Sequence, residues 1–72
     1  MTTFQELNFS PYACNVLDYV GRDGLVTANN QPVKIQHLTA GFVITIDYNQ
    51  FTPMSNLDAS YLLNSWQVGV KS

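Results

Sequence analysis

The segment from Phe42 to Tyr48 most constrains the fold, because its side chains alternate as in a half-buried β-strand and many of them are β-branched or aromatic. The predicted apolar face of this strand consists of Phe42, Ile44, Ile46 and Tyr48. The opposite face carries Val43, Thr45 and Asp47. Such a strand needs a partner strand on at least one side and an apolar layer over one face.

Two further strands are predicted immediately before this segment. Residues 25–28 and 33–38 are rich in β-formers, and the intervening Asn-Asn-Gln-Pro sequence is typical of a four-residue hairpin loop. In the second of these strands Val33, Ile35 and His37 share one face, while Lys34 and Gln36 share the other. Short turns on both sides of residues 33–38 favour an antiparallel meander.

A first helix is predicted over residues 11–20. Ser10 is a good N-cap, Pro11 suits the first helical position, and Gly21 suits the left-handed residue that ends a helix. The apolar residues that recur at i, i+3, i+4 and i+7 are Ala13, Val16, Leu17 and Val20.

A second helix is predicted over residues 56–66, with Ser55 and Asp58 resembling a capping box and Asn56 as the alternative cap. Its apolar stripe consists of Ala59, Leu62, Leu63 and Trp66. Residues 3–9 fit a short helical turn or an extended segment equally well. Residues 67–72 are expected to form a tail in which Val68 and Val70 could add a short edge strand.

These elements predict a single α+β domain over residues 1–72, in which a three-stranded antiparallel meander is covered on one face by two helices. The uncovered face would then present Lys34, Gln36, Val43, Thr45 and Asp47 to solvent or to a partner. A chain of 72 residues has room for only a small core, and such domains often gain stability from disulfides, metals or association.

The composition argues against a cofactor or a metal. Cys14 is the one cysteine, so an internal disulfide is excluded, and Cys14 with His37 cannot make a structural zinc site. We expect Cys14 to be a structural thiol and His37 a sheet-edge histidine. The glycines of Gly21-Arg22-Asp23-Gly24 form no phosphate loop, because the lysine and hydroxyl residues that such a loop requires do not follow.

The exterior is predicted to be unusually poor in charge. Three Lys and Arg and five Asp and Glu residues stand against seven Asn and five Gln. A surface covered by neutral amides and hydroxyls repels its neighbours weakly and forms hydrogen bonds readily, which suits a protein that binds another protein. Three basic residues cannot neutralise a nucleic-acid backbone, so direct nucleic-acid binding is not expected. No apolar run is long enough to span a membrane, and the N-terminal sequence does not resemble a signal peptide, so we expect a cytoplasmic protein. For a viral protein this would be the host cell cytoplasm.

A protein-binding surface is predicted on the first helix, where two tyrosines lie seven residues apart with polar residues between them. Tyrosine provides a large contact area at low entropic cost, which is typical of protein interfaces. The residues expected to contact a partner are Tyr12, Asn15, Asp18, Tyr19, Asp23 and Asp47. The simpler interpretation is that the two rings only flank the core.

The favoured function is that of a small non-catalytic module that sterically blocks a larger protein, for example one that handles nucleic acid. Phage-encoded inhibitors of host defence, anti-CRISPR proteins among them, have this size and composition, and the comparison is by analogy alone. The alternative is a self-associating subunit, a homodimer or larger homo-oligomer or part of a virus particle, because an unguarded strand edge invites pairing. An enzyme that uses Cys14 is the third hypothesis, ahead of direct nucleic-acid binding.

Overall fold

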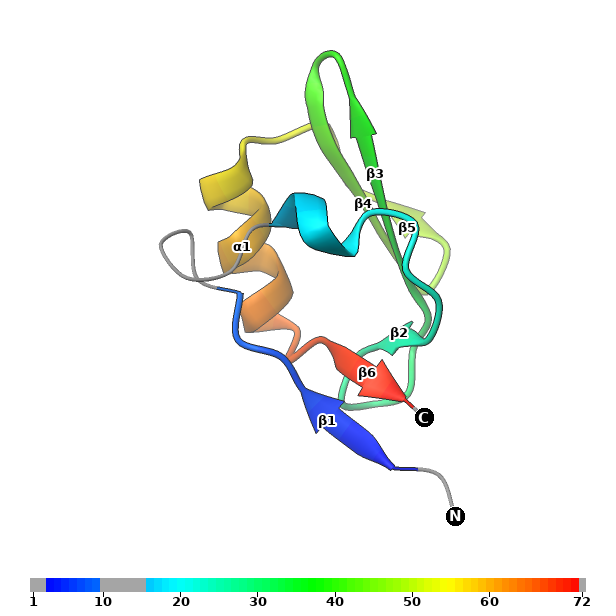
Figure 1. The fold of residues 1–72 in the computed structure, drawn as a ribbon. Coiled ribbons are helices and arrows are strands. Elements are labelled where there is room, and N and C mark those ends of the chain that lie inside the picture. Colours follow the sequence, from blue (N-terminus) through cyan, green and yellow to red (C-terminus); the bar gives the residue numbers. More distant parts are fainter. Residues whose placement is uncertain (1–2, 10–15, 72) are drawn as a thin grey trace.

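The computed structural model describes residues 3–9 and 16–71, which form two small antiparallel sheets and one α-helix (Figure 1). One sheet has the strand order β3-β4-β5, with β3 at Val33–Leu38, β4 at Gly41–Ile46 and β5 at Asn49–Gln50. The other has the order β1-β6-β2, with β1 at Phe4–Glu6, β6 at Gly69–Lys71 and β2 at Leu25–Val26. The α-helix α1 spans Asn56–Ser65, and a short 3₁₀ helix, η1, spans Val16–Tyr19.

The β3-β4-β5 sheet has one buried and one open face. Residues opposite each other in the β3–β4 ladder share a face, so the pairs Val33–Ile46 and Ile35–Ile44 place four buried side chains together. Helix α1 and η1 lie on this same side of the sheet (Figure 1). The opposite pairs, Lys34–Thr45 and Gln36–Val43, project from the outer face. Lys34 is exposed there and Gln36 and Thr45 are half-buried, but Val43, which the sequence predicts to be uncovered, is only 3% exposed.

Strand β4 is paired along both edges. Beyond β5, the N–H of Phe51 donates to the carbonyl of Ile44 at 2.8 Å, and Phe42 exchanges two hydrogen bonds with Met54 at 2.8 and 2.9 Å. Residues 49–54 therefore line the side of β4 that β3 leaves free. β4, the strand with the clearest alternation in the sequence, therefore has no open edge for pairing with another chain.

Helix α1 begins and ends with well-formed caps. The Ser55 hydroxyl accepts the N–H of Asp58 at 3.2 Å, so Ser55 rather than Asn56 is the N-cap. At the other end Gln67 adopts a left-handed φ of 54°. Its N–H donates to the backbone carbonyl of Asn64, and the N–H of Val68 donates to the backbone carbonyl of Leu63 at 3.1 Å. These two bonds are those of a Schellman motif, normally built on glycine. The predicted helix over 56–66 is confirmed except at Trp66, which is the C-cap.

The fold predicted from the sequence, a three-stranded meander covered by two helices, is wrong. Two three-stranded sheets and one helix of ten residues are present instead. Strand β2 pairs with β6 and meets the β3 segment only through the isolated bridge Val26–Pro32. The C-terminal residues, expected to form a tail or an edge strand, are the central strand of the second sheet.

The predicted first helix is also wrong where it can be compared. Residues 16–19 form a 3₁₀ helix, and residues 11–15 lie outside the described part of the chain. The N–H of Val16 donates to the Asn56 side chain of α1 at 3.1 Å, so a tertiary hydrogen bond takes the place of an intrahelical one. The N–H of Val20 then reaches only three residues back, to Leu17. Gly21 is left-handed at φ 75°, as expected.

Both sheets and α1 contribute to one hydrophobic core. Fully buried side chains include Phe9, Val16, Ile44, Leu63 and Val68. Phe42 is buried as predicted, whereas Trp66, predicted in the core, is 38% exposed because it lies just past the last turn of α1. Within the described residues, no helix has the length and hydrophobicity required to cross a bilayer.

Candidate protein-binding surface

The residues predicted to contact a partner do not form one cluster. Asp18 and Tyr19 lie on η1 and Asp23 lies in the turn that follows it, whereas Asp47 lies in the turn between β4 and β5. Tyr12 and Asn15 lie outside the described residues. The predicted surface is therefore divided between at least two regions.

Tyr19 contributes to the core as well as to the surface. Its ring meets the ring of the fully buried Phe9 edge-on, with the centroids 5.1 Å apart, and is itself half-buried. The guanidinium carbon of Arg22 lies 5.8 Å from the Tyr19 ring centroid, within the range of a cation–π contact. This position agrees with the simpler interpretation, that the ring flanks the core.

The pocket next to Arg22 results from a mismatch in chain length. The N–H of Gly21 donates to the Ile35 carbonyl at 3.4 Å, and Val26 forms an isolated antiparallel β-bridge with Pro32. Between these two contacts the chain advances five residues along 21–26 but only three along 32–35. The longer segment bends away, and its Gly24 carbonyl accepts the N–H of Lys71 at 2.9 Å. A cavity of about 410 Å³ remains between the two segments.

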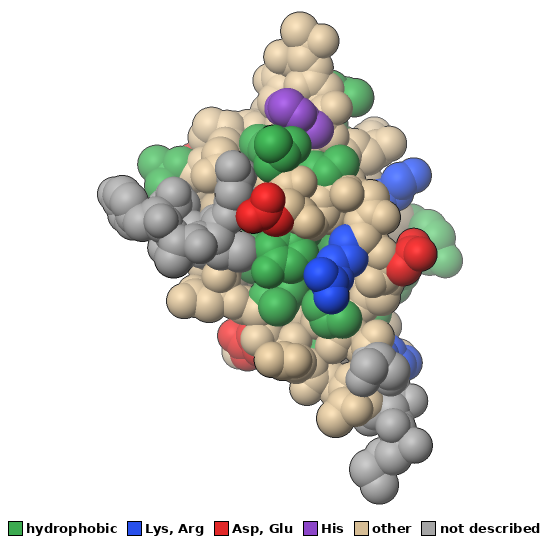
Figure 2. Space-filling view, in the orientation of Figure 1, with side chains coloured by type: hydrophobic (Ala, Val, Ile, Leu, Met, Phe, Trp, Pro, Cys, Tyr) green, Lys and Arg blue, Asp and Glu red, His purple; other side chains and the backbone are tan. Residues whose placement is uncertain are grey.

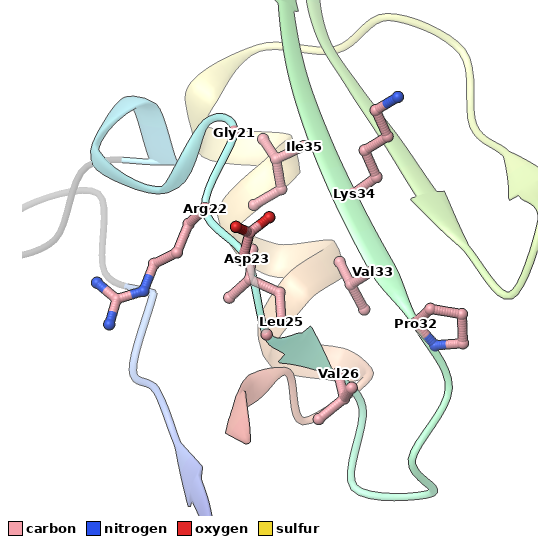
Figure 3. Close-up of a pocket in the computed structure, with 10 residues that line it drawn as sticks. Gly21, Arg22, Asp23, Leu25, Val26, Pro32, Val33, Lys34 and Ile35 are labelled. Carbon is pink, nitrogen blue, oxygen red and sulfur yellow. The ribbon is translucent and has the colours of Figure 1, made fainter. Parts of the chain in front are cut away.

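The side chains of this pocket do not converge on a common point. Figure 3 shows the Arg22 and Lys34 side chains extending in opposite directions away from the gap, with the apolar groups of Leu25, Val33 and Ile35 between them. A small-molecule site normally directs a few polar groups at one ligand. Within the described residues there is also no group of three or more His, Cys, Asp and Glu side chains suited to a metal ion. The pocket therefore gives no support for a cofactor or an anion.

The single histidine also lacks the surroundings of a reactive group. His37 stacks on Phe42 with the ring centroids 4.6 Å apart, at the end of the β3–β4 hairpin. The Phe42 ring is buried while His37 is exposed, so the imidazole covers part of the apolar face. This contact accounts for its alternation with Val33 and Ile35 in the sequence.

The turn between β4 and β5 holds the most exposed aromatic side chain of the described structure. Ile46 pairs with Asn49, so Asp47 and Tyr48 form a two-residue loop, and both have positive φ, at 50° and 69°. This is the type I′ geometry, in which Asn-Gly and Asp-Gly sequences are favoured. Tyr48 is 89% exposed, so it makes almost no contact that would offset its backbone conformation.

The sequence analysis assigned Tyr48 to the buried face of a strand, and that assignment is wrong. The strand ends at Ile46, and the two-residue turn reverses the chain before the alternation can continue. Positions 47 and 48 hold neither glycine nor asparagine, so the residues that usually indicate this turn type are missing from the sequence. The signal that could have indicated it is Asn49-Gln50, which resumes a polar strand directly afterwards.

Two shallow cavities lie on the outer face of the β3-β4-β5 sheet. The first, called the Tyr48 notch, has a volume of about 220 Å³ and is lined by Pro32, Val33, Lys34, Thr45 and Tyr48. The second, called the Pro53 notch, has a volume of about 310 Å³ and is lined by Leu38, Val43, Gln50, Phe51, Thr52 and Pro53. Both have largely apolar walls.

Few charged side chains lie on the exterior, as the composition predicts. On the face seen in Figure 2, the few charged side chains lie among hydrophobic, neutral polar and backbone atoms. Comparisons with protein-family models, with curated proteins and with solved structures gave no match.

Proposed function

We propose that this protein is a small non-catalytic binding module that blocks a surface on a larger protein, and that it makes contact through the outer face of the β3-β4-β5 sheet around Tyr48. The observation that carries the proposal is the exposed Tyr48 ring on a left-handed backbone. A side chain with a Cβ raises the energy of that conformation by roughly 1–2 kcal/mol. Strain of this kind, without a structural contact to offset it, is common at functional sites.

The chemistry of the surface supports a protein partner. An exposed tyrosine beside an apolar notch is typical of the anchor residues of protein interfaces. Asp47 lies next to Tyr48 and its carboxylate accepts from the Gln31 amide at 3.4 Å, which leaves it able to pair with a basic group on the partner. Asp18, on η1, and Asp23, in the turn that follows it, would contribute a second acidic region.

The wider proposal remains an inhibitor of the phage anti-defence type acting in the cytoplasm, by analogy of size and composition. Steric occlusion by a domain of this size requires no cofactor and no catalytic group. The alternative, self-association through an open strand edge, lacks its original support, because β4 is paired on both sides.

Co-purification with matched variants tests the proposal. The tagged protein and the variants Tyr48→Asn and Tyr61→Asn are recovered from the same host lysate, and bound proteins are identified by mass spectrometry. Tyr61 is a suitable control, because it is 64% exposed on α1 and does not line either notch. We expect a stoichiometric partner with the unchanged protein and with Tyr61→Asn, and its loss with Tyr48→Asn. Equal recovery by all three proteins, or no partner at all, would contradict the proposal.

A further inference from the structure

The outer face of the β3-β4-β5 sheet has the form of a seat for a helix. Thr45 lines the Tyr48 notch and Val43 lines the Pro53 notch, and both side chains project from the same face of β4. Residues two apart in a strand are separated by about 6.8 Å. The two notches thus lie at least this far apart along the central strand.

The geometry excludes an extended segment as the natural occupant. A peptide that lies on the face of a sheet receives no main-chain hydrogen bonds from it. The backbone N–H and carbonyl groups of β4 point along the plane of the sheet and pair with β3 and with residues 49–54. An extended chain would bury unpaired N–H and carbonyl groups there, at a large energetic cost. A helix pairs its own backbone groups, and its apolar residues at i, i+4 and i+7 cover distances of about 6 to 10 Å.

The charge of this face indicates which charged group a bound helix should carry. In the part of the chain that the structure describes, Lys34 is the one charged side chain that β3, β4 and β5 direct to this face. Its stem forms a wall of the Tyr48 notch. A carboxylate on the flank of the helix would complement the ammonium group.

We propose that this face binds an amphipathic helix of the partner, with apolar side chains in the Tyr48 and Pro53 notches and a carboxylate beside Lys34. This inference rests on the proposed function and adds the chemistry of the partner to it.

The probe is a designed helical peptide of about 18 residues with Leu at i, i+4 and i+7 and Glu beside the stripe. Two controls are a scrambled peptide of the same composition and a peptide with Lys in place of Glu. Titration into the isotopically labelled full chain is followed by amide chemical shifts. We expect shifts confined to β3, β4, the Asp47–Tyr48 turn and residues 50–53, with the Glu peptide binding about two- to fivefold more tightly than the Lys peptide. The variant Lys34→Glu should reverse that preference.

Three results would overturn the inference: no shifts on this face with the Glu peptide, equal binding of the scrambled peptide, or shifts that depend on protein concentration in the absence of peptide. The outcome is separable from that of the proposed function. If the peptides fail while partner recovery still depends on Tyr48, the surface binds a protein but not through a helix. If partner recovery does not depend on Tyr48, the proposed function itself fails.

Discussion

Replacement of Asn64 should show that one side-chain amide of α1 holds the N-terminal segment in place. The Oδ1 atom of Asn64 accepts the N–H of Phe9 at 2.9 Å, and its Nδ2 group donates to the Phe9 carbonyl. Phe9 is fully buried, and its ring packs in the main core. The amide thus satisfies both backbone groups of a buried residue that lies 55 positions away in the sequence.

The expected loss is large for so small a domain. Leaving a buried backbone donor or acceptor unpaired costs about 1–3 kcal/mol. Asn64→Ala removes both partners, and because Asn64 itself is exposed, water can reach part of the site, so we expect a loss of about 2–4 kcal/mol. A domain of this length has a total stability of roughly 4–11 kcal/mol at 0.05–0.15 kcal/mol per residue. The expected loss is therefore between about a fifth of the total stability and all of it.

A pair of Asn→Asp variants separates the acceptor from the donor. Asn64→Asp keeps an acceptor for the Phe9 N–H but faces the Phe9 carbonyl with a charged oxygen, so we expect about half of the alanine loss at pH 7. Asn56→Asp is the control, because the bond that the Asn56 side chain makes to another described segment is accepted by its oxygen, from the Val16 N–H, and a carboxylate in the first turn of α1 is favourable. Urea unfolding monitored by circular dichroism and by the fluorescence of Trp66 gives the free energies.

The pH dependence of the two variants should have opposite signs. In Asn64→Asp only the protonated carboxyl can donate to the Phe9 carbonyl, so the folded-state pKa of the new carboxyl is raised above its unfolded value of about 3.9. Its stabilising contribution is complete below about pH 3.9 and is lost as the pH rises through the folded-state pKa. In Asn56→Asp the folded-state pKa is depressed, and stability relative to the unchanged protein falls on acidification. Equal unfolding energies for Asn64→Ala and the unchanged protein, or parallel pH profiles, would refute the reasoning.

Four further substitutions test the strained and unpaired positions. Ser60→Ala should raise stability by about 1 kcal/mol in urea unfolding, because the Ser60 hydroxyl is buried on α1 with no hydrogen-bond partner among the described residues. Gln67→Gly should raise the free energy of unfolding by roughly 1 kcal/mol, because glycine adopts the left-handed C′ conformation of the Schellman motif without strain. The change is measured as a higher midpoint of thermal unfolding. Tyr48→Asn should leave stability unchanged or raise it by up to about 1 kcal/mol, whereas an anchored core tyrosine would lose about 3–5 kcal/mol. Gly69→Ala should lose more than about 2 kcal/mol and the amide protection of β1, because a Cβ there would overlap the Gln5 carbonyl and lie 2.7 Å from the Phe4 ring.

Elements whose signals lie within their own residues could be predicted from the sequence. The alternation in β4 and the Ser55 cap followed by the apolar spacing of α1 both give the correct element, with ends displaced by one or two residues. The alternation also gives which side chains share a face of the β3–β4 ladder, but not the burial of Val43 on the face that was predicted to be uncovered. Each of these depends on periodicity over six or more residues, which tertiary contacts did not override.

The second sheet could not be predicted, because its strands are only two or three residues long. Strands of this length contain at most one full period of alternation. β6 is central because Gly69 allows the Phe4 ring to pack directly on its backbone, a close approach that no local pattern encodes. The 3₁₀ conformation of residues 16–19 likewise depends on a hydrogen bond to Asn56, forty positions away.

The amide-rich composition has a different meaning in the folded structure than in the sequence. A chain with seven Asn and five Gln but eight charged residues suggested an exterior built for a partner. Several of these amides instead bind the protein itself: Asn64 and Asn56 hold backbone groups of the N-terminal segment, Gln31 accepts from the Thr27 hydroxyl, and Asn30 accepts from Lys71. The amide count alone therefore does not argue for binding. Tyr48 is what favours a partner, because an exposed ring on a left-handed turn is the feature of this surface that stability alone does not explain.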